Sequence, residues 1–136
     1  MRVSQARFSV TAGAIITDNE GRVLLLKHRF RPSPGWGVPG GFIEPGEQPE
    51  EALRRELREE VELEVKHVKL FTTRTFSQPQ QIEIVFTARA IADTERLSFE
   101  IQRVAWFSPD ELPRELPEDQ AELIKRAFAD GVITED

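Results

Sequence analysis

The 136-residue sequence predicts an α/β fold in which helices cover a mixed β-sheet. Segments rich in β-branched and aromatic residues recur along the chain between turn sequences, as expected for strands. Two other segments space their apolar residues at the helical period. No repeat, low-complexity segment or linker divides the chain, so residues 1–136 are expected to form a single domain.

Two strands and a long loop are expected before the first helix. Residues 8–18 (FSVTAGAIITD) and 22–29 (RVLLLKHR) have strand composition, and the turn sequence DNEG between them predicts a hairpin. Residues 31–41 (RPSPGWGVPGG) hold three prolines and four glycines, which exclude a helix there. We expect residues 42–49 to continue this loop.

The first helix is expected from Pro49 to about Leu63. Proline suits a first helical turn, and Glu50 and Glu51 complement the positive end of the helix dipole. The expected order then continues with strands at 64–76, 81–91 and 102–108, a turn at 77–80, a short helix or turn at 108–113, and a final helix at 118–131 that Gly131 ends.

Composition excludes several classes of protein. The net charge of −6 argues against a non-specific binder of nucleic-acid polymers, which would carry a basic surplus. The sequence has no cysteine, which excludes disulfides, zinc–thiolate sites and a thiolate nucleophile. No apolar run approaches membrane-spanning length and the first residues lack a signal-peptide core, so we expect no membrane association and a cytoplasmic location.

The glutamates of the first helix have an unusual placement. At about 100° per residue, Leu53, Leu57 and Val61 form the buried stripe. Glu56 and Glu60 fall directly beside that stripe, and Glu59 lies slightly further round. Carboxylates at the edge of a core must be neutralised, or their pKa values rise. Hard divalent cations prefer clusters of carboxylate oxygens, so this side of the helix is a candidate cation site.

An ordinary surface helix is the alternative. On the wheel, Glu51, Arg54, Arg55 and Arg58 face solvent, and three oppositely charged pairs have the spacing of helical ion pairs: Glu50–Arg54, Glu51–Arg55 and Arg55–Glu59. Glu47, near the helix start, is first interpreted as a capping carboxylate. Gly40 and Gly41, just before it, permit the close approach of a ligand or ion.

These residues together resemble the Nudix box, G-x5-E-x7-R-E-U-x-E-E-x-G-U, in which U is a bulky aliphatic residue. The matching residues run from Gly41 through Glu47 and the motif RELREEV to Leu63. Glu62 replaces the last glycine of the pattern, and we expect an altered helix exit, for instance a later one. The segments GWGVPGG and VAWFSPDELP also look like Nudix sequences, so the resemblance covers residues 8–130.

The resemblance implies the Nudix fold, an α/β/α sandwich around a mixed sheet. It also implies hydrolysis of a nucleoside diphosphate linked to another group, with Mg²⁺ or alternatively Mn²⁺. The family's roles map onto metal ligands at Glu56, Glu59, Glu60 and the Gly41 carbonyl, an orienting arginine at Arg55, and a supporting carboxylate at Glu47. The general base is Glu56 or a glutamate of a later loop, for which Glu100 is the first candidate and Glu83 the second.

The substrate stays open at this level. Pro79, sixteen residues after Leu63, resembles a proline of branches that cleave ADP-ribose, with an ordinary turn proline as the alternative. Branches of the family that cleave diadenosine polyphosphates tend to use a tyrosine in that region, and this chain has no tyrosine, so the resemblance disfavours that substrate. Oxidised nucleoside triphosphates remain candidates. Gly40 and Gly41 are predicted to contact the substrate, together with three residues at the end of the second strand for which a solvated loop rim is the alternative: His28, Arg29 and Arg31.

Aromatic residues and assembly complete the expectations. Phe30, Trp36 and Phe76 are candidates for stacking on a base, with core positions as the alternative. A nucleotide is the expected partner, and the resemblance predicts a homodimer. Two other functions are weighed against an active enzyme: a Nudix domain that senses a nucleotide without cleaving it, and a structural domain whose charged helix is only a surface.

Overall fold

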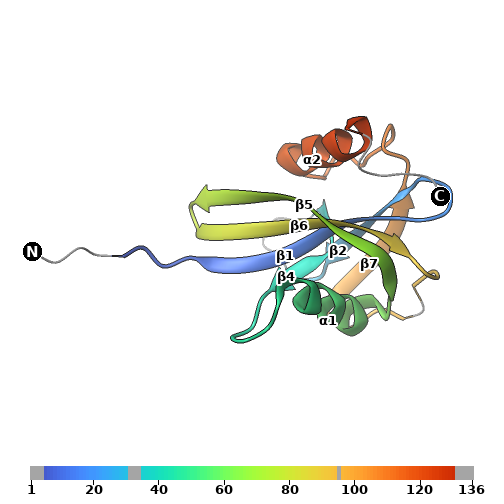
Figure 1. Ribbon diagram of the computed structural model, residues 1–136. Coiled ribbons are helices and arrows are strands. Elements are labelled where there is room, and N and C mark those ends of the chain that lie inside the picture. Colours follow the sequence, from blue (N-terminus) through green and yellow to red (C-terminus); the bar gives the residue numbers. More distant parts are fainter. Residues whose placement is uncertain (1–4, 31–34, 95, 131–136) are drawn as a thin grey trace, which may run out of the picture.

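The computed structural model describes residues 5–30, 35–94 and 96–130. Within these residues, seven strands form one mixed sheet, and two helices cover its opposite faces (Figure 1). The elements are β1 (Ser9–Thr17), β2 (Val23–His28), β3 (Trp36–Gly37), β4 (Gly40–Phe42), α1 (Pro49–Val61), β5 (Val65–Ser77), β6 (Gln80–Ala90), β7 (Ile101–Phe107) and α2 (Glu118–Ala129). The predicted α/β sandwich is confirmed.

The central strand is β1, which pairs in parallel with β6 along its whole length. The strand order is β3-β2-β1-β6-β5, and β4 adds to β1 while β7 adds to β2. The predicted hairpin pairs β1 with β2 at Thr17 and Val23, beside a turn that the Asp18 carboxylate closes by accepting the Glu20 and Arg22 N–H groups. Beyond this point β4 lies against β1, so the loop before α1 is brought to the centre of the sheet.

The sheet separates two hydrophobic cores. Successive strand residues point to opposite faces, so Ile16 packs in the core under α1 and Ile15 in the core under α2. On the first face, the α1 residues Leu53, Leu57 and Val61 are fully buried, as the helical wheel predicts. Burial on both faces explains why β1 is apolar without alternation from Ala12 to Ile16, and β2 from Val23 to Leu26.

Most boundaries agree with the sequence-based expectations within two residues, with one exception. The segments predicted as loops contain the short strands β3 and β4, whose glycine-rich composition conceals them. Of the two possibilities expected for residues 108–113, a short helix or a turn, the structure has the turn, at Pro109 and Asp110. Gly131, the predicted stop of the last helix, lies outside the described residues. Neither helix among the described residues is long and apolar enough to cross a membrane.

The end of α1 differs from the expectation of a later exit. The helix stops at Val61, and Glu62 adopts the left-handed conformation, with φ of 51° and ψ of 42°. The Glu62 N–H donates to the Arg58 carbonyl and the Leu63 N–H to the Leu57 carbonyl, each at 3.2 Å. Glu62 also pairs with Arg96. The chain therefore takes the backbone conformation that favours glycine, at a steric cost to a residue with a Cβ.

Replacing Glu62 with glycine is expected to give a free energy of unfolding about 1 kcal/mol higher than that of Glu62→Ala, because only glycine adopts this conformation without a steric penalty. Alanine is the matched control, since both variants lose the ion pair with Arg96. Urea denaturation at neutral pH measures the difference. Equal stabilities, or a less stable glycine variant, would contradict the strain assigned to Glu62.

Candidate active site

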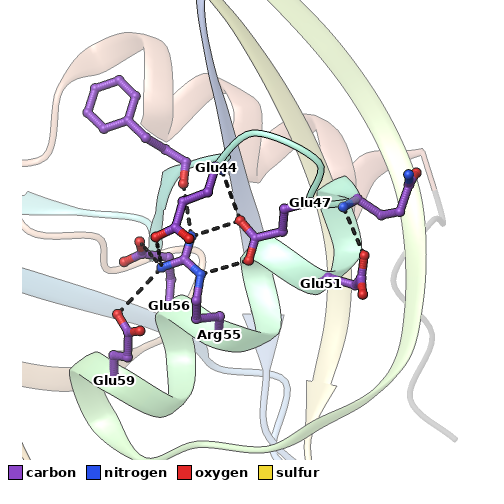
Figure 2. A network of polar contacts seen from close by, with 8 residues as sticks. Glu44, Glu47, Glu51, Arg55, Glu56 and Glu59 are labelled. Carbon is purple, nitrogen blue, oxygen red and sulfur yellow. Dashed lines mark hydrogen bonds and ion pairs between the residues drawn. The ribbon is translucent and has the colours of Figure 1, made fainter.

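The guanidinium of Arg55 is the centre of a cluster of carboxylates at the start and middle of α1 (Figure 2). Its Nε and Nη2 donate to the two oxygens of Glu47 at 2.7 and 2.9 Å, a bidentate pair. Its Nη1 donates to Glu56 Oε1 at 2.9 Å and lies 3.5 Å from Glu59 Oε2, and Nη2 also reaches the Phe42 carbonyl. The wheel placed Arg55 on the solvated side, and this is wrong, because its side chain is only 22% exposed.

Glu47 holds the arginine, and it does not cap the helix. The N-cap of α1 is Gln48, whose N–H donates to Glu51 Oε1 at 2.9 Å. Glu51 therefore caps the helix. Arg55 pairs with Glu47 instead of forming the expected ion pair with Glu51. The hydrogen bond from Arg55 and the N–H of Glu44 lower the pKa of Glu47 from 4.5 to about 2. Glu47 therefore stays ionised as a fixed counter-charge to Arg55.

Glu56 is packed against the backbone of Gly41. A Cβ built on Gly41 would lie 2.4 Å from the Glu56 carboxyl carbon, a distance that side chains do not tolerate. A side chain at this point of β4 would therefore displace the Glu56 carboxylate from its place against the strand, so Gly41 lets the helix present that carboxylate to the bare backbone. Burial raises the pKa of Glu56; Arg55 opposes the rise, and the charges of Glu59 and Glu100 add to it.

Glu60 joins α1 to the end of β2 and to the segment before β7. The residue is only 5% exposed, and its Oε2 lies 3.8 Å from His28 Nε2. Its backbone carbonyl accepts the Ser98 N–H at 2.8 Å. The wheel's placement of Glu60 beside the buried stripe is thus confirmed. His28 meets this carboxylate, a contact that sequence spacing could not show.

The two later candidates for a base lie in different places. Glu100 lies near Glu56, whose pKa it raises, and its carbonyl accepts the Arg29 N–H at 2.7 Å. Glu83 lies on the opposite face of the sheet, since its neighbour Val85 packs in the core under α2. There Glu83 pairs with Arg74 at 2.7 Å. The structure brings Glu100 to the site and does not bring Glu83.

The residues predicted to contact substrate also separate. A Cβ on Gly40 would lie 2.5 Å from the Ala12 carbonyl oxygen, so packing against β1 already accounts for this glycine. Arg29 Nε donates to the Phe99 carbonyl at 2.9 Å, which places Arg29 beside Glu100. Arg31 lies outside the described residues. Pro79 occupies the exposed turn between β5 and β6, as an ordinary turn proline would.

The stacking candidates differ in exposure. Trp36 is buried in the core under α2, and Phe76 is partly buried beside Arg74. Phe30 is 66% exposed and contacts Phe99, which is 74% exposed. Sequence reasoning missed Phe99 and Ser98, since no spacing rule links residues 98–100 to α1. Their only signal was the neighbouring Glu100.

The chemistry of the donors at the site fits a hard divalent cation. Glu56, Glu59 and Glu60 lie on one helix, and the Glu56 carboxylate touches the Gly41 backbone, so carboxylate and carbonyl oxygens are available together. Within the described residues, no three acidic or histidine side chains are already arranged around one point. Glu56 and Glu59 instead both face Arg55.

Comparisons with known proteins agree with this architecture. The NUDIX domain model matches residues 7–127. A MutT-like protein of Streptomyces ambofaciens is 28% identical over 81% of this chain and 70% of its own length. The crystal structure of a MutT NUDIX hydrolase from Burkholderia pseudomallei superposes with a TM-score of 0.77 at 26% identity, covering 88% of this chain and 98% of that one.

A second kind of relative is longer. The NAD-capped RNA hydrolase NudC of Chromobacterium violaceum is 31% identical over 76% of this chain, but the match spans only 40% of that protein. The chain belongs to the NUDIX domain family and is a Nudix hydrolase, which confirms the resemblance seen in the sequence. Hydrolases of this family act on nucleotide substrates and generally use divalent metal ions.

Replacing Glu47 with glutamine is expected to lower the melting temperature by several degrees at pH 7. The folded-state pKa of Glu47 is depressed, so its stabilisation is present above pH 4.5 and is lost as the pH falls toward 2. The difference between wild type and variant should therefore shrink across that range. Thermal melts at several pH values measure it.

Glu44→Gln is the matched control, because Glu44 lies 3.7 Å from the same guanidinium but is 66% exposed. It should change the melting temperature little at any pH. A difference between wild type and Glu47→Gln that stayed constant down to pH 2 would exclude the ionised Glu47–Arg55 pair as its source.

Proposed function

We propose that the chain hydrolyses a pyrophosphate bond in a nucleoside diphosphate linked to another group, in a reaction that depends on a divalent cation. The observation that carries this proposal is the Glu56 carboxylate, which lies against Gly41 on a helix that also carries Glu59 and Glu60 and is close enough to Glu59 and Glu100 for their charges to raise its pKa. A site so rich in like charge would repel an anionic substrate unless cations lay between them.

In this proposal the carboxylates of Glu56, Glu59 and Glu60 and the carbonyl of Gly41 hold Mg²⁺, or alternatively Mn²⁺. The cation supplies charge neutralisation for the pyrophosphate and lowers the pKa of water. Arg55 keeps Glu56 in place through their hydrogen bond, while Glu47 fixes Arg55 from the other side. This arrangement supports Arg55 as a positioning residue.

Glu56 is the first choice for the group that accepts the proton of the attacking water. Burial already raises its pKa, which makes its carboxylate a better proton acceptor than an exposed glutamate. Glu100 is the second choice, because it lies near Glu56 and on a different element. Its carbonyl accepts the Arg29 N–H, and the Ser98 N–H two residues earlier donates to the Glu60 carbonyl, so two backbone hydrogen bonds hold this segment next to α1.

The proposal specifies the nucleotide part of the substrate, and several groups linked to that nucleotide are candidates. A nucleotide sugar such as ADP-ribose and an oxidised nucleoside triphosphate are the candidates that the sequence suggests. The name of the NudC relative adds a dinucleotide pyrophosphate, NAD, as a third. A panel of ADP-ribose, oxidised dGTP and NAD, with Mg²⁺ and with Mn²⁺ at pH 7–9, separates them. No turnover on any nucleotide of a broad panel would overturn the proposal.

The glutamates should separate by role. Glu56→Gln is expected to lower kcat by about two to four orders of magnitude if it is the base. Glu59→Gln and Glu60→Gln are expected to weaken Mg²⁺ binding by at least about 10-fold, since losing a charged ligand should cost no less than losing a group that only orients a ligand, which costs about 10- to 100-fold. Calorimetry with Mg²⁺ and steady-state kinetics measure the two effects.

Glu50→Gln is the matched control on the same helix, because Glu50 pairs with Arg54 and faces away from Arg55. It should leave both Mg²⁺ affinity and kcat within twofold of wild type. Unchanged Mg²⁺ affinity in Glu59→Gln and Glu60→Gln would favour the alternative of a purely structural charged helix. Nucleotide binding without product would favour a sensing domain.

A cytoplasmic location and a homodimer remain predictions that belong to this proposal. Sedimentation of the purified chain measures the assembly.

A further inference from the structure

Two phenylalanines form an exposed aromatic pair outside both hydrophobic cores. The rings of Phe30 and Phe99 lie 5.5 Å apart between centroids, tilted by 54°, although the residues are 69 positions apart in the sequence. Phe30 is 66% exposed and Phe99 is 74% exposed. Single exposed apolar residues are common, but two aromatic rings in contact, both mostly open to solvent, mark a binding surface more often.

The backbone on either side of Phe99, and the residue before Phe30, are hydrogen-bonded within the candidate active site. Phe99 stands between Ser98, whose N–H donates to the Glu60 carbonyl, and Glu100, whose carbonyl accepts the Arg29 N–H. Phe30 directly follows Arg29 in the chain. These hydrogen bonds hold the backbone that carries both rings against α1 and the end of β2, next to Glu60 and Glu100.

The charge around the pair suits one end of a nucleotide. The Arg29 guanidinium lies 5.0 Å from the centre of the Phe99 ring, and its Nε donates to the Phe99 carbonyl at 2.9 Å. The surface therefore combines two aromatic faces with a cation, next to carboxylates whose chemistry fits divalent ions. A nucleotide has the same order of parts: a flat base at one end and anionic phosphates at the other.

We propose that the Phe30–Phe99 pair stacks on the nucleobase of the substrate. This inference rests on the proposed function and assigns the base a place beside Glu100. A ring face is available on every base, so stacking on this pair holds the base without reading its hydrogen-bonding edge. The enzyme should therefore accept adenine and guanine nucleotides with similar KM values.

The test uses AMP and ribose 5-phosphate as probes, because they share the sugar and phosphate and differ only in the base. Phe99→Ala is expected to weaken AMP binding about 10-fold, which corresponds to about 1.4 kcal/mol, and to leave ribose 5-phosphate binding unchanged. Phe99→Trp, which keeps an aromatic face, should retain AMP binding within about threefold. Phe8→Ala, at another exposed phenylalanine that precedes β1, is the control and should change neither.

Two readouts identify stacking directly. AMP should shift the NMR signals of the Phe30 and Phe99 rings of the wild-type protein upfield, and ribose 5-phosphate should not. On whichever substrate the panel identifies, Phe30→Ala and Phe99→Ala should raise KM about 10-fold and change kcat by less than twofold. A fall in kcat at unchanged KM would show that the rings act through Glu100, and would overturn the proposal.

Other outcomes also decide the matter. Equal losses for AMP and ribose 5-phosphate in Phe99→Ala, or no loss for AMP, would overturn the base-stacking role. A dimer that dissociates in Phe99→Ala, with AMP affinity unchanged, would show that a second copy covers the pair. AMP binding does not require hydrolysis, so a selective AMP loss in a protein without turnover would support the stacking pair while the proposed hydrolysis failed.

Discussion

The repulsion among carboxylates around one helix is the constraint on which the rest of the site depends. The Arg55 guanidinium faces the side chains of Glu44, Glu47, Glu56 and Glu59. Its strongest bonds go to Glu47, which stays ionised at any pH near neutrality. The arginine is thereby held from one side and offers its remaining donors to Glu56 and Glu59. A lysine could not replace it, because a point charge lacks the planar fork that bonds several oxygens at once.

Burial and charge act against each other in the same few residues. Leu53, Leu57 and Val61 anchor α1 to the sheet, and this anchoring carries Glu56 and Glu60 into a partly dry environment. The raised pKa of Glu56 is a direct consequence of that packing. The depth at which α1 packs on the core thus sets the pKa of Glu56. A helix packed less deeply would expose this carboxylate and return its pKa toward the ordinary value.

Sequence periodicity was sufficient to predict features that depend only on the spacing of residues within one element. The wheel of α1 identified Glu60 as lying beside the core, because burial of a helical stripe depends only on spacing within the helix. It failed for Arg55, because the Glu47 that removes Arg55 from solvent comes from a loop outside the helix. The strand β4 and the role of Phe99 were missed for the same reason, since pairing with β1 and contact with Phe30 are set by distant segments.

The two faces of the sheet are unequal, because the glutamates of the candidate site lie on α1 and therefore on one face only. The carboxylates and Phe99 depend on the layer that contains α1, whereas α2 packs on the far core with residues such as Ile15 and Leu123. Substitutions of similar size under the two helices should therefore be constrained differently in evolution. Substitutions under α2 would be selected against mainly when they prevent folding. Substitutions under α1 would also be selected against when they move a carboxylate of the candidate site. The sequence of the core under α2 should therefore vary more than that of the core under α1.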